Sequence, residues 1–417
     1  MEKENLKAPQ SGISPFSKEH DMFRETVRSF LAKEITPHVD EWEEKEIFPR
    51  WVWERMGEMG FFGLRYPEEF GGSNLDYWYT VVLVEELAKI GCGGLGMGLT
   101  VHMNMATPAL ARHGSYELKK KFLEPAIKGK AVSAIAVTEP GAGSDVAAIQ
   151  TRAQRQGDHY VINGRKMFIT NGTQADFVTT LVKTDVAKGH HGFTLIIVPT
   201  NTPGFSVGRK LKKLGNRSSD TAELIYDNVT VPVTNRIGEE GKGFKYQMEQ
   251  FQDERLSACI STSSGAYATY ERTKEYAKTR IVFGRPISGF QVNQFKFAEM
   301  LTQITAMKAF VYHCCHRFVN GEDITKDVSL CKIFSGQASQ FVVDTCLQLH
   351  GGYGYMDEYK VSRAYRDNRL FRIGAGSDEV MKEIVAKMEG LSGKEGPRES
   401  HQRRVDESIV KPTSPLP

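Results

Sequence analysis

The sequence has few of the features that mark secreted, membrane-spanning or nucleic-acid-binding proteins. Only six of the 417 residues are cysteines, and their spacing does not suggest disulfide pairs, so a reducing compartment fits the chain. The sequence contains no apolar run of the roughly 18 residues that would indicate a membrane-spanning helix. The formal net charge is only +3 at pH 7 and the basic residues are mostly dispersed, which gives no support for nucleic-acid binding.

Signals for targeting and for metal binding are also missing. Residues 1–5 have no apolar signal core and do not resemble a transit peptide, so we expect a cytoplasmic protein, or a mitochondrial-matrix protein if the chain is eukaryotic. His313, Cys314, Cys315 and His316 are consecutive on a predicted helix, where neighbouring side chains point about 100° apart. They cannot converge on one ion, so no metal site is expected.

The segments that are present follow a helical, then β-rich, then helical order, which predicts a multidomain α+β protein. The predicted parts are an all-helical domain over residues 1–130, a small β-barrel or sandwich over 131–240, a four-helix bundle over 241–390 and a flexible tail over 391–417. Within the β-rich part, Asn163-Gly164 and Asn171-Gly172 are typical of hairpin turns. A ligand site is expected where such domains meet.

The longest predicted helix begins near Gly243, and no proline interrupts it before Pro286. Glu254 lies one turn from both Phe251 and Ala258, which places its carboxylate on or beside the apolar stripe. A carboxylate that is removed from water has a raised pKa and is a stronger base. The alternative is a solvated or arginine-paired glutamate, which is the usual state on a helix.

Residues 135–145, Ile-Ala-Val-Thr-Glu-Pro-Gly-Ala-Gly-Ser-Asp, predict a strand that runs into a glycine-rich loop. Gly141 and Gly143 would let backbone N–H groups approach an anion, and Thr138 and Ser144 add hydroxyl groups. The lysine of a Walker loop and the βαβ context of a Rossmann fingerprint are both missing. Taken alone, this loop is either a tight turn or a ligand site.

Five motifs, found in the same order, make the chain similar to the acyl-CoA dehydrogenase family of flavoenzymes. They lie at residues 137–145, 164–171, 280–284 with Phe290-Gln291, 348–355, and Arg366-Asp367. The first resembles one family signature, and the last two together resemble another. The second resembles the strand whose aromatic residue packs near the flavin, and the third resembles the segment that reaches the FAD of a neighbouring subunit. The similarity runs from about residue 17 to residue 389.

The resemblance implies the fold described above, FAD as the cofactor and a specific reaction. That reaction is α,β-dehydrogenation of an acyl-CoA thioester to the trans-2-enoyl-CoA, in which a carboxylate removes the α-proton and the β-hydride goes to flavin N5. Electrons would then leave to an electron-transferring flavoprotein. Because one motif reaches a neighbour's FAD, the resemblance also implies a homo-oligomer, expected to be a tetramer built as a dimer of dimers.

The position of the catalytic base differs between branches of this family. Many members carry it in a Tyr-Glu-Gly-Thr stretch, but residues 373–377 here are Ile-Gly-Ala-Gly-Ser, and Ala375 occupies the place of the glutamate. The branch that resembles isovaleryl-CoA and long-chain dehydrogenases has the base in a Glu-Arg-Leu context, which Glu254, Arg255 and Leu256 match. This branch implies a branched or medium-to-long acyl substrate. Ala375 keeps the N–H that, in the family, stabilises the enolate oxygen together with a ribityl hydroxyl.

The same residue-by-residue comparison implies the rest of the site. The expected FAD contacts are Ile135, Val137, Thr138, Gly143, Ser144, Phe168, Ile169, Thr170, Arg280, Phe283, Gln291, Gln348, Leu349, Gly351, Gly352, Ser377 and Glu379. Ser144, Arg255 and Gly376 are expected near the acyl-CoA. Two positions depart from the common pattern, since Phe168 replaces a tryptophan and Ser218 replaces a frequent glycine in a loop near the CoA region.

Two other functions stay open on the sequence. A flavin oxidase or monooxygenase could use the same fold, although such oxidases are usually longer and the monooxygenase-like relatives lack the base. A non-catalytic acyl-CoA-binding protein is suggested only by Ala375. If Glu254 is not the base, Glu139 and Glu379 are the next candidates by their positions.

Overall fold

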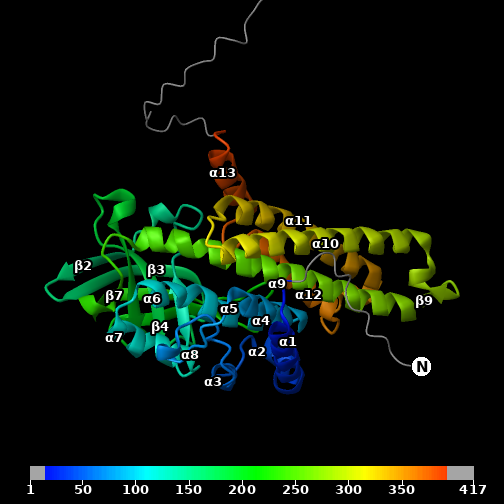
Figure 1. The fold of residues 1–417 in the computed structure, drawn as a ribbon, viewed down its shortest axis with the longest axis horizontal. Coiled ribbons are helices and arrows are strands. Elements are labelled where there is room, and N and C mark those ends of the chain that lie inside the picture. Colours follow the sequence, from blue (N-terminus) through cyan, green and yellow to red (C-terminus); the bar gives the residue numbers. More distant parts are fainter. Residues whose placement is uncertain (1–14, 392–417) are drawn as a thin grey trace, which may run out of the picture.

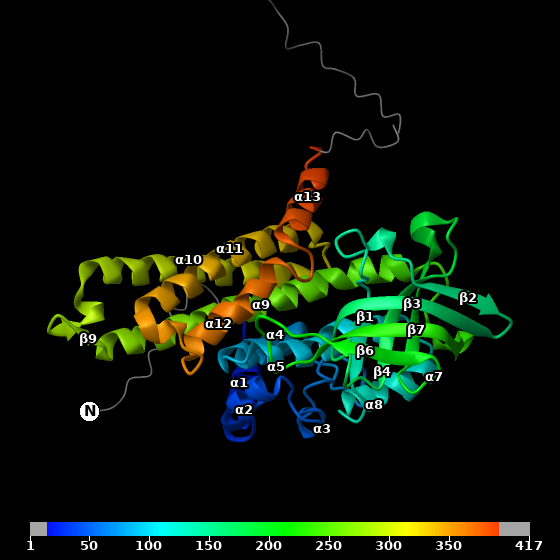
Figure 2. The same cartoon turned by 180° about the vertical axis from the view of Figure 1, so that it is seen from behind.

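The computed structural model describes residues 15–391, which form a helical region, a β-sheet and a second helical region in chain order (Figure 1). Residues 1–14 of the predicted helical domain, and all but the first residue of the predicted tail 391–417, lie outside the described residues. The long helices of the C-terminal region extend from the sheet at one end of the molecule to a small β-hairpin at the other (Figures 1 and 2). None of the described helices is long and apolar enough to cross a membrane.

The N-terminal region is built from short helices packed around aromatic side chains. Its α-helices are α1 (Lys18–Phe30), α2 (Val39–Lys45), α3 (Trp51–Glu58), α4 (Tyr77–Lys89), α5 (Gly93–Thr100), α6 (Pro108–His113), α7 (Tyr116–Leu118) and α8 (Glu124–Ile127). Helix α1 begins with a reciprocal cap, in which the Ser17 hydroxyl accepts the His20 N–H and the His20 ring accepts the Ser17 N–H. Buried side chains of α1 and α4 form one core with Leu256 of the C-terminal region, so the two helical regions share apolar packing.

The central region is one eight-stranded sheet, which confirms the predicted β domain. Its strands are β1 (Ser133–Ala136), β2 (Arg152–Gln156), β3 (His159–Thr170), β4 (Phe177–Lys183), β5 (Phe193–Pro199), β6 (Phe205–Lys210), β7 (Thr221–Pro232) and β8 (Arg236–Ile237). Their order is β6-β7-β3-β2-β4-β5-β8, and β1 pairs in parallel with β4. The burial pattern of β4 and β5 is almost continuous, as expected for strands covered on both faces.

Neither Asn-Gly pair closes a hairpin as predicted, because one lies inside a strand and the strands on either side of the other, β3 and β4, do not pair. Asn163-Gly164 lies inside β3, which continues past a bulge between Ile162 and Gly164. Gly164 is needed there for space, because a Cβ at this position would lie 2.4 Å from Thr151 Oγ1. Asn171 has a φ of 65° and begins the turn that follows β3, as its Asn-Gly sequence predicts.

The C-terminal region is dominated by three long helices that pack on one another. Its elements are α9 (Gly243–Thr279), the β9 (Ile281–Val282) and β10 (Arg285–Pro286) hairpin, α10 (Gln291–Val319), α11 (Thr325–His350), α12 (Lys360–Asn368) and α13 (Asp378–Met388). Helix α9 has 37 residues and is therefore about 55 Å long. It begins against β5 and also packs on α4, α10 and α11, so it links all three regions.

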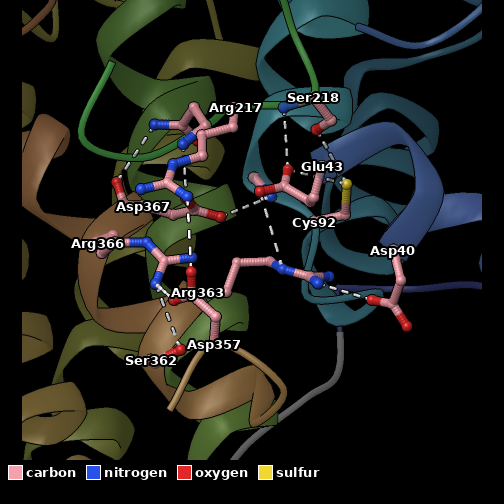
Figure 3. Close-up of polar contacts among 12 residues, drawn as sticks. Asp40, Glu43, Cys92, Arg217, Ser218, Asp357, Ser362, Arg363, Arg366 and Asp367 are labelled. Atoms are coloured by element: carbon pink, nitrogen blue, oxygen red, sulfur yellow. Dashed lines mark hydrogen bonds and ion pairs between the residues drawn. The ribbon is translucent and has the colours of Figure 1, made fainter. Parts of the chain in front are cut away.

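The three regions also meet at a buried cluster of polar side chains (Figure 3). Glu43 of α2 accepts the Ser218 N–H at 3.0 Å and faces Arg363 Nε of α12 at 3.8 Å. Asp367, also on α12, accepts the Gly93 N–H at 3.0 Å. Burial and then the nearby Glu43 carboxylate raise the pKa of Asp367 to about 6. Each region therefore contributes hydrogen bonds that fix it against the other two.

A buried ion pair holds the glycine-rich loop against the sheet. Lys166 of β3 is fully buried, and its Nζ lies 2.9 Å from Glu139 Oε1 and 2.9 Å from the Val137 carbonyl oxygen. Glu139 also accepts the N–H groups of Gln150 and Thr151. Burial alone would raise the pKa of Glu139, but Lys166 and these N–H groups hold it below its usual value. Glu139 is thus an ionised anchor, which argues against it as an alternative base.

We predict that Lys166→Met lowers the free energy of unfolding by about 3–5 kcal/mol, because the Glu139 carboxylate would stay buried without its partner. Chemical denaturation of the purified variant measures this loss. Lys188→Met is the control, since Lys188 is exposed and pairs with Asp185 at the surface, and it should leave the stability unchanged. Equal stabilities of the two variants would contradict a structural role for the buried pair.

Candidate active site

Glu254 lies in the first half of α9 and is only 5% exposed. Its Oε1 accepts hydrogen bonds from Gln250 Nε2 at 2.9 Å and from Gln247 Nε2 at 3.3 Å, one and two turns earlier on the same helix. Burial raises the pKa of Glu254 to about 8, although the two amides and the neighbouring Arg255 act in the opposite direction. A carboxyl group with this pKa can take up or release a proton near neutral pH.

The orientation of the Gln250 amide is set from outside α9. Its Oε1 accepts the Ala109 N–H at 3.0 Å, and its Nε2 also donates to the Met105 carbonyl. The Gln250 N–H therefore points to Glu254 whatever the charge on the carboxyl group. Sequence reasoning missed Gln247 and Gln250, although their spacing of seven and four residues from Glu254 places all three on one face of the helix.

The segment that contains Ala375 and Gly376 lies beside Arg255 of α9. It connects the short helix η11 (Arg369–Arg372) to α13. A Cβ on Gly376 would lie 3.6 Å from Arg255 Nη2 and 2.5 Å from Met381 Cε, so only glycine fits there without rearrangement. The fold thus brings Arg255, next to Glu254, together with a segment about 120 residues further along the chain.

The backbone of this segment is strained, and the N–H group of Ala375 is free in it. Ala375 has a φ of 52° and Gly376 a φ of 90°, so two successive residues lie in the left-handed region. Alanine rarely adopts this conformation, and such residues concentrate at functional sites. Ala375 is exposed, and none of the residues that the structure describes accepts a hydrogen bond from its N–H. This N–H can therefore donate to a ligand.

A second group of expected site residues lies on the central sheet. Phe168 has a φ of 61° and is 66% exposed, at the register shift between Lys166 and Ile169. The Met167 N–H donates to the Thr138 carbonyl at 2.8 Å, so the β3 bulge lies against the start of the glycine-rich loop.

The other predicted residues of this group differ in exposure. Gly143 and Ser144 are exposed, whereas Ile135, Val137, Thr138 and Thr170 are partly buried. Ile169 is only 3% exposed, so its side chain belongs to the core and only its backbone can meet a ligand. The Ser377 hydroxyl accepts the Val380 N–H as the cap of α13, and Glu379 is exposed in the first turn of that helix.

A third group lies at the other end of the long helices. A cleft of about 540 Å³ is lined by Arg280, Gln348, Leu349, Gly351 and Gly352, with Tyr276, Val282, Ile287, His350, Tyr353 and Met356. The Arg280 guanidinium lies over the Tyr353 ring at 5.3 Å from its centre. Phe283, in the hairpin, has a φ of 47° and is 97% exposed, and Gln291 is exposed at the start of α10.

The cleft is far from Glu254 within one protomer. Glu254 lies within α9 and Arg280 caps its C-terminus, 26 residues later, which corresponds to about 39 Å along a continuous helix. The hairpin and the sheet also lie at opposite ends of the molecule in both views (Figures 1 and 2). One protomer therefore does not bring the sheet group and the cleft group to one place.

Ser218, which replaces a frequent glycine, is fully buried in the polar cluster of Figure 3. Its Oγ lies 3.1 Å from Cys92 Sγ and its N–H donates to Glu43. The space for its hydroxyl comes from Gly94, because a Cβ there would lie 2.3 Å from Ser218 Oγ. The side chain of Ser218 thus contacts the N-terminal region and does not face an open ligand site.

Comparison with known proteins gives matches to all three regions. Models of the N-terminal, middle and C-terminal domains of acyl-CoA dehydrogenase match residues 17–130, 134–229 and 241–389. The mitochondrial long-chain specific acyl-CoA dehydrogenase of Mus musculus is 39% identical over 374 residues, which are 89% of this chain and 86% of that protein. The mitochondrial isovaleryl-CoA dehydrogenase of Oryza sativa subsp. japonica is 37% identical over 89% of this chain and 91% of its own length.

The fold is also similar to that of a solved structure. The crystal structure of acyl-CoA dehydrogenase from Geobacillus kaustophilus superposes with a TM-score of 0.89 at 43% sequence identity, over 91% of this chain and 100% of that chain. The matched regions span both helical parts and the sheet between them, in the order that the motifs predict. The chain therefore belongs to the acyl-CoA dehydrogenase family of oxidoreductases.

Proposed function

We propose that this protein converts an acyl-CoA thioester to the trans-2-enoyl-CoA, with Glu254 removing the α-proton. The observation that carries the proposal is a buried carboxyl group of raised pKa next to Arg255, which lies beside a segment with a free N–H at Ala375. When bound, FAD would supply the acceptor for the β-hydride. Membership of the family supports this reaction class.

The chemistry of Glu254 follows from its surroundings. Taking the α-proton converts a buried carboxylate into a neutral acid, so the burial that raises its pKa favours proton uptake. The negative charge that leaves Glu254 appears on the thioester oxygen. In this proposal the free N–H of Ala375 donates to that oxygen, and a donor fixed in advance stabilises such a charge with little reorganisation.

The residues on the sheet and in the cleft fit the two ends of a flavin dinucleotide. Phe168 offers an exposed aromatic ring. Ser144 and Thr170, which belong to the motifs of the same region, offer hydroxyl groups. The distal cleft offers the Arg280 cation and two glycines to a phosphate-bearing group. Because these two groups are far apart within one protomer, we propose that FAD binds across a subunit interface in a homotetramer.

The proposed substrates are branched or medium-to-long acyl-CoA thioesters, and the proposed electron acceptor is an electron-transferring flavoprotein. The Glu254-Arg255-Leu256 context together with Ala375 supports this branch of the family. A panel of acyl-CoA thioesters with an artificial electron acceptor tests the substrate. Oxygen uptake in the same assay distinguishes a dehydrogenase, which should consume little oxygen, from a flavin oxidase.

We predict that Glu254→Gln lowers the rate of flavin reduction by acyl-CoA roughly 10²- to 10⁴-fold, because the side chain keeps its shape and loses its basicity. Anaerobic stopped-flow absorbance of the flavin measures the rate. Glu249→Gln is the matched control, since Glu249 lies on the same helix with a partly exposed side chain that pairs with Lys245, and it should react like the wild type. Reduction of Glu254→Gln at the wild-type rate would exclude Glu254 as the base.

The pH dependence provides a separate prediction. Only the carboxylate form of Glu254 accepts a proton, so kcat/KM should rise with pH along a limb near pH 8. Gln247→Met removes an N–H that favours the carboxylate, so the pKa of Glu254 should rise and the limb should move to higher pH. The plateau at high pH should stay unchanged. A limb at the same pH in both enzymes would show that this hydrogen bond does not tune Glu254.

We predict that Arg280→Ala lowers FAD retention more than it lowers folding stability. The Arg280 side chain is exposed at the cleft, where it lies over the Tyr353 ring, so its truncation removes little packing from the protomer and leaves its backbone hydrogen bonds in place. Flavin content after gel filtration and thermal unfolding of the apoprotein measure the two effects. Equal losses in both would make Arg280 structural, and tight FAD binding by a monomer would contradict the shared site.

A further inference from the structure

Lys332 of α11 is a buried cation without a carboxylate partner. It is fully buried, and its Nζ donates to the Phe371 carbonyl at 2.8 Å and to the Gly376 carbonyl at 2.6 Å. Among the residues that the structure describes, no aspartate or glutamate forms an ion pair with it. An unpaired charge in the interior is costly, and a methionine would fill a similar space. The role of this lysine therefore lies in the two carbonyl groups that it binds.

Both carbonyls that Lys332 binds belong to the segment that carries Ala375. Phe371 is in η11, before the segment, and Gly376 follows Ala375 directly. One ammonium group thus joins the two ends of residues 371–376 and holds them on α11. The Phe371 ring also lies over the Nζ, with its centre 4.8 Å away.

The segment needs such support because its backbone conformation is unfavourable. The consecutive positive φ values of Ala375 and Gly376 cost conformational energy, which persists only when surrounding contacts enforce it. Within the segment, the N–H groups of Ile373 and Gly374 both donate to the Leu370 carbonyl at 2.8 Å. The ion pair of Arg372 with Asp378 at 2.7 Å and the packing of Met381 on Gly376 add side-chain contacts. Lys332 adds hydrogen bonds to the backbone from a different helix, α11.

We propose that Lys332 is a positioning residue for the reaction, which fixes the 371–376 segment so that the Ala375 N–H points to the thioester oxygen. Lys332 does not touch the substrate in this account and acts only through the two carbonyls. This inference rests on the proposed function, in which the Ala375 N–H donates to the thioester oxygen. It also predicts that the effect of Lys332 is on the chemical step and not on cofactor binding.

The test compares Lys332→Met with Lys326→Met in the FAD-loaded enzyme. Lys326 lies one and a half turns earlier on the same helix and pairs at the surface with Glu389, so its variant receives the same substitution outside the site. Anaerobic flavin reduction at increasing concentrations of a good acyl-CoA substrate gives both the limiting rate and the apparent Kd. The measurement is repeated with substrate deuterated at the α-carbon.

Lys332→Met should lower the limiting rate roughly 10- to 100-fold, as expected when an oxyanion donor is misplaced but not deleted. Its apparent Kd and flavin content should stay within about threefold of the wild type, the ordinary scatter for a site that keeps its binding contacts. The α-deuterium isotope effect should increase, because proton removal becomes more rate-limiting. Lys326→Met should behave like the wild type in every measurement.

Two results would overturn the proposal. A wild-type limiting rate in Lys332→Met would show that the ammonium does not position the segment for catalysis. A loss of flavin and of thermal stability, with a normal rate for each flavin that remains, would show a structural role only. If no acyl-CoA reduces the flavin of the wild-type enzyme, the proposed function itself is wrong. That outcome is distinguishable from the two results above.

A second variant covers the case in which Lys332→Met does not fold. Lys332→Gln keeps an N–H donor on a shorter, uncharged side chain, so the interior is less perturbed. Its limiting rate should lie between those of the wild type and a variant without a donor, and its isotope effect should be raised. A wild-type rate and isotope effect in Lys332→Gln would equally overturn the proposal.

Discussion

The burial of the Glu254 carboxyl group is the constraint on which the rest of the site depends. It raises the pKa of a glutamate from its usual value to about 8, and it does so against the pull of two amide donors and an adjacent arginine. Helix α9 is packed on several sides by α4, α10 and α11, and Ala109 of α6 binds Gln250 beside Glu254. The length of α9 and its contacts with all three regions are thus linked directly to the chemistry proposed for one side chain.

Backbone strain marks the other parts of the site. In the described part of the chain, eight non-glycine residues have a positive φ, and four of them are asparagines, which tolerate it. A fifth, Glu46, ends helix α2. The remaining three are Phe168, Phe283 and Ala375, and each lies in a motif that the family resemblance assigns to the site. Strain at these positions is consistent with ligand-binding geometry that the fold enforces.

Part of this structure could be predicted from the sequence, and the reasons are physical. Hydrophobic periodicity indicated the helical, β and helical order, and the spacing of Phe251, Glu254 and Ala258 indicated a buried carboxylate. The turn at Asn163-Gly164 was wrong because Gly164 serves a close approach to Thr151 instead. Local sequence contains no information on that neighbour, which comes from a different strand.

The polar partners of the site were the least predictable feature. The Ala109 N–H that orients Gln250, the carbonyls that bind Lys332 and the Glu43 side chain that accepts the Ser218 N–H all come from distant segments. The sequence around a buried polar side chain does not show whether its hydrogen-bond partner is near or distant along the chain. The assignments of individual cofactor contacts stay predictions from the resemblance, and Ile169 can contribute only its backbone.

The central claim is that Glu254 itself removes the α-proton, and proton exchange tests it without hydride transfer. The FAD-loaded enzyme is incubated in D₂O with an acyl-CoA whose β-carbon is replaced by sulfur, so that it cannot be dehydrogenated. Mass spectrometry then follows deuterium at the α-carbon. We expect rapid exchange by the wild-type enzyme and none above the uncatalysed rate by Glu254→Gln. Exchange by Glu254→Gln at the wild-type rate would contradict the account.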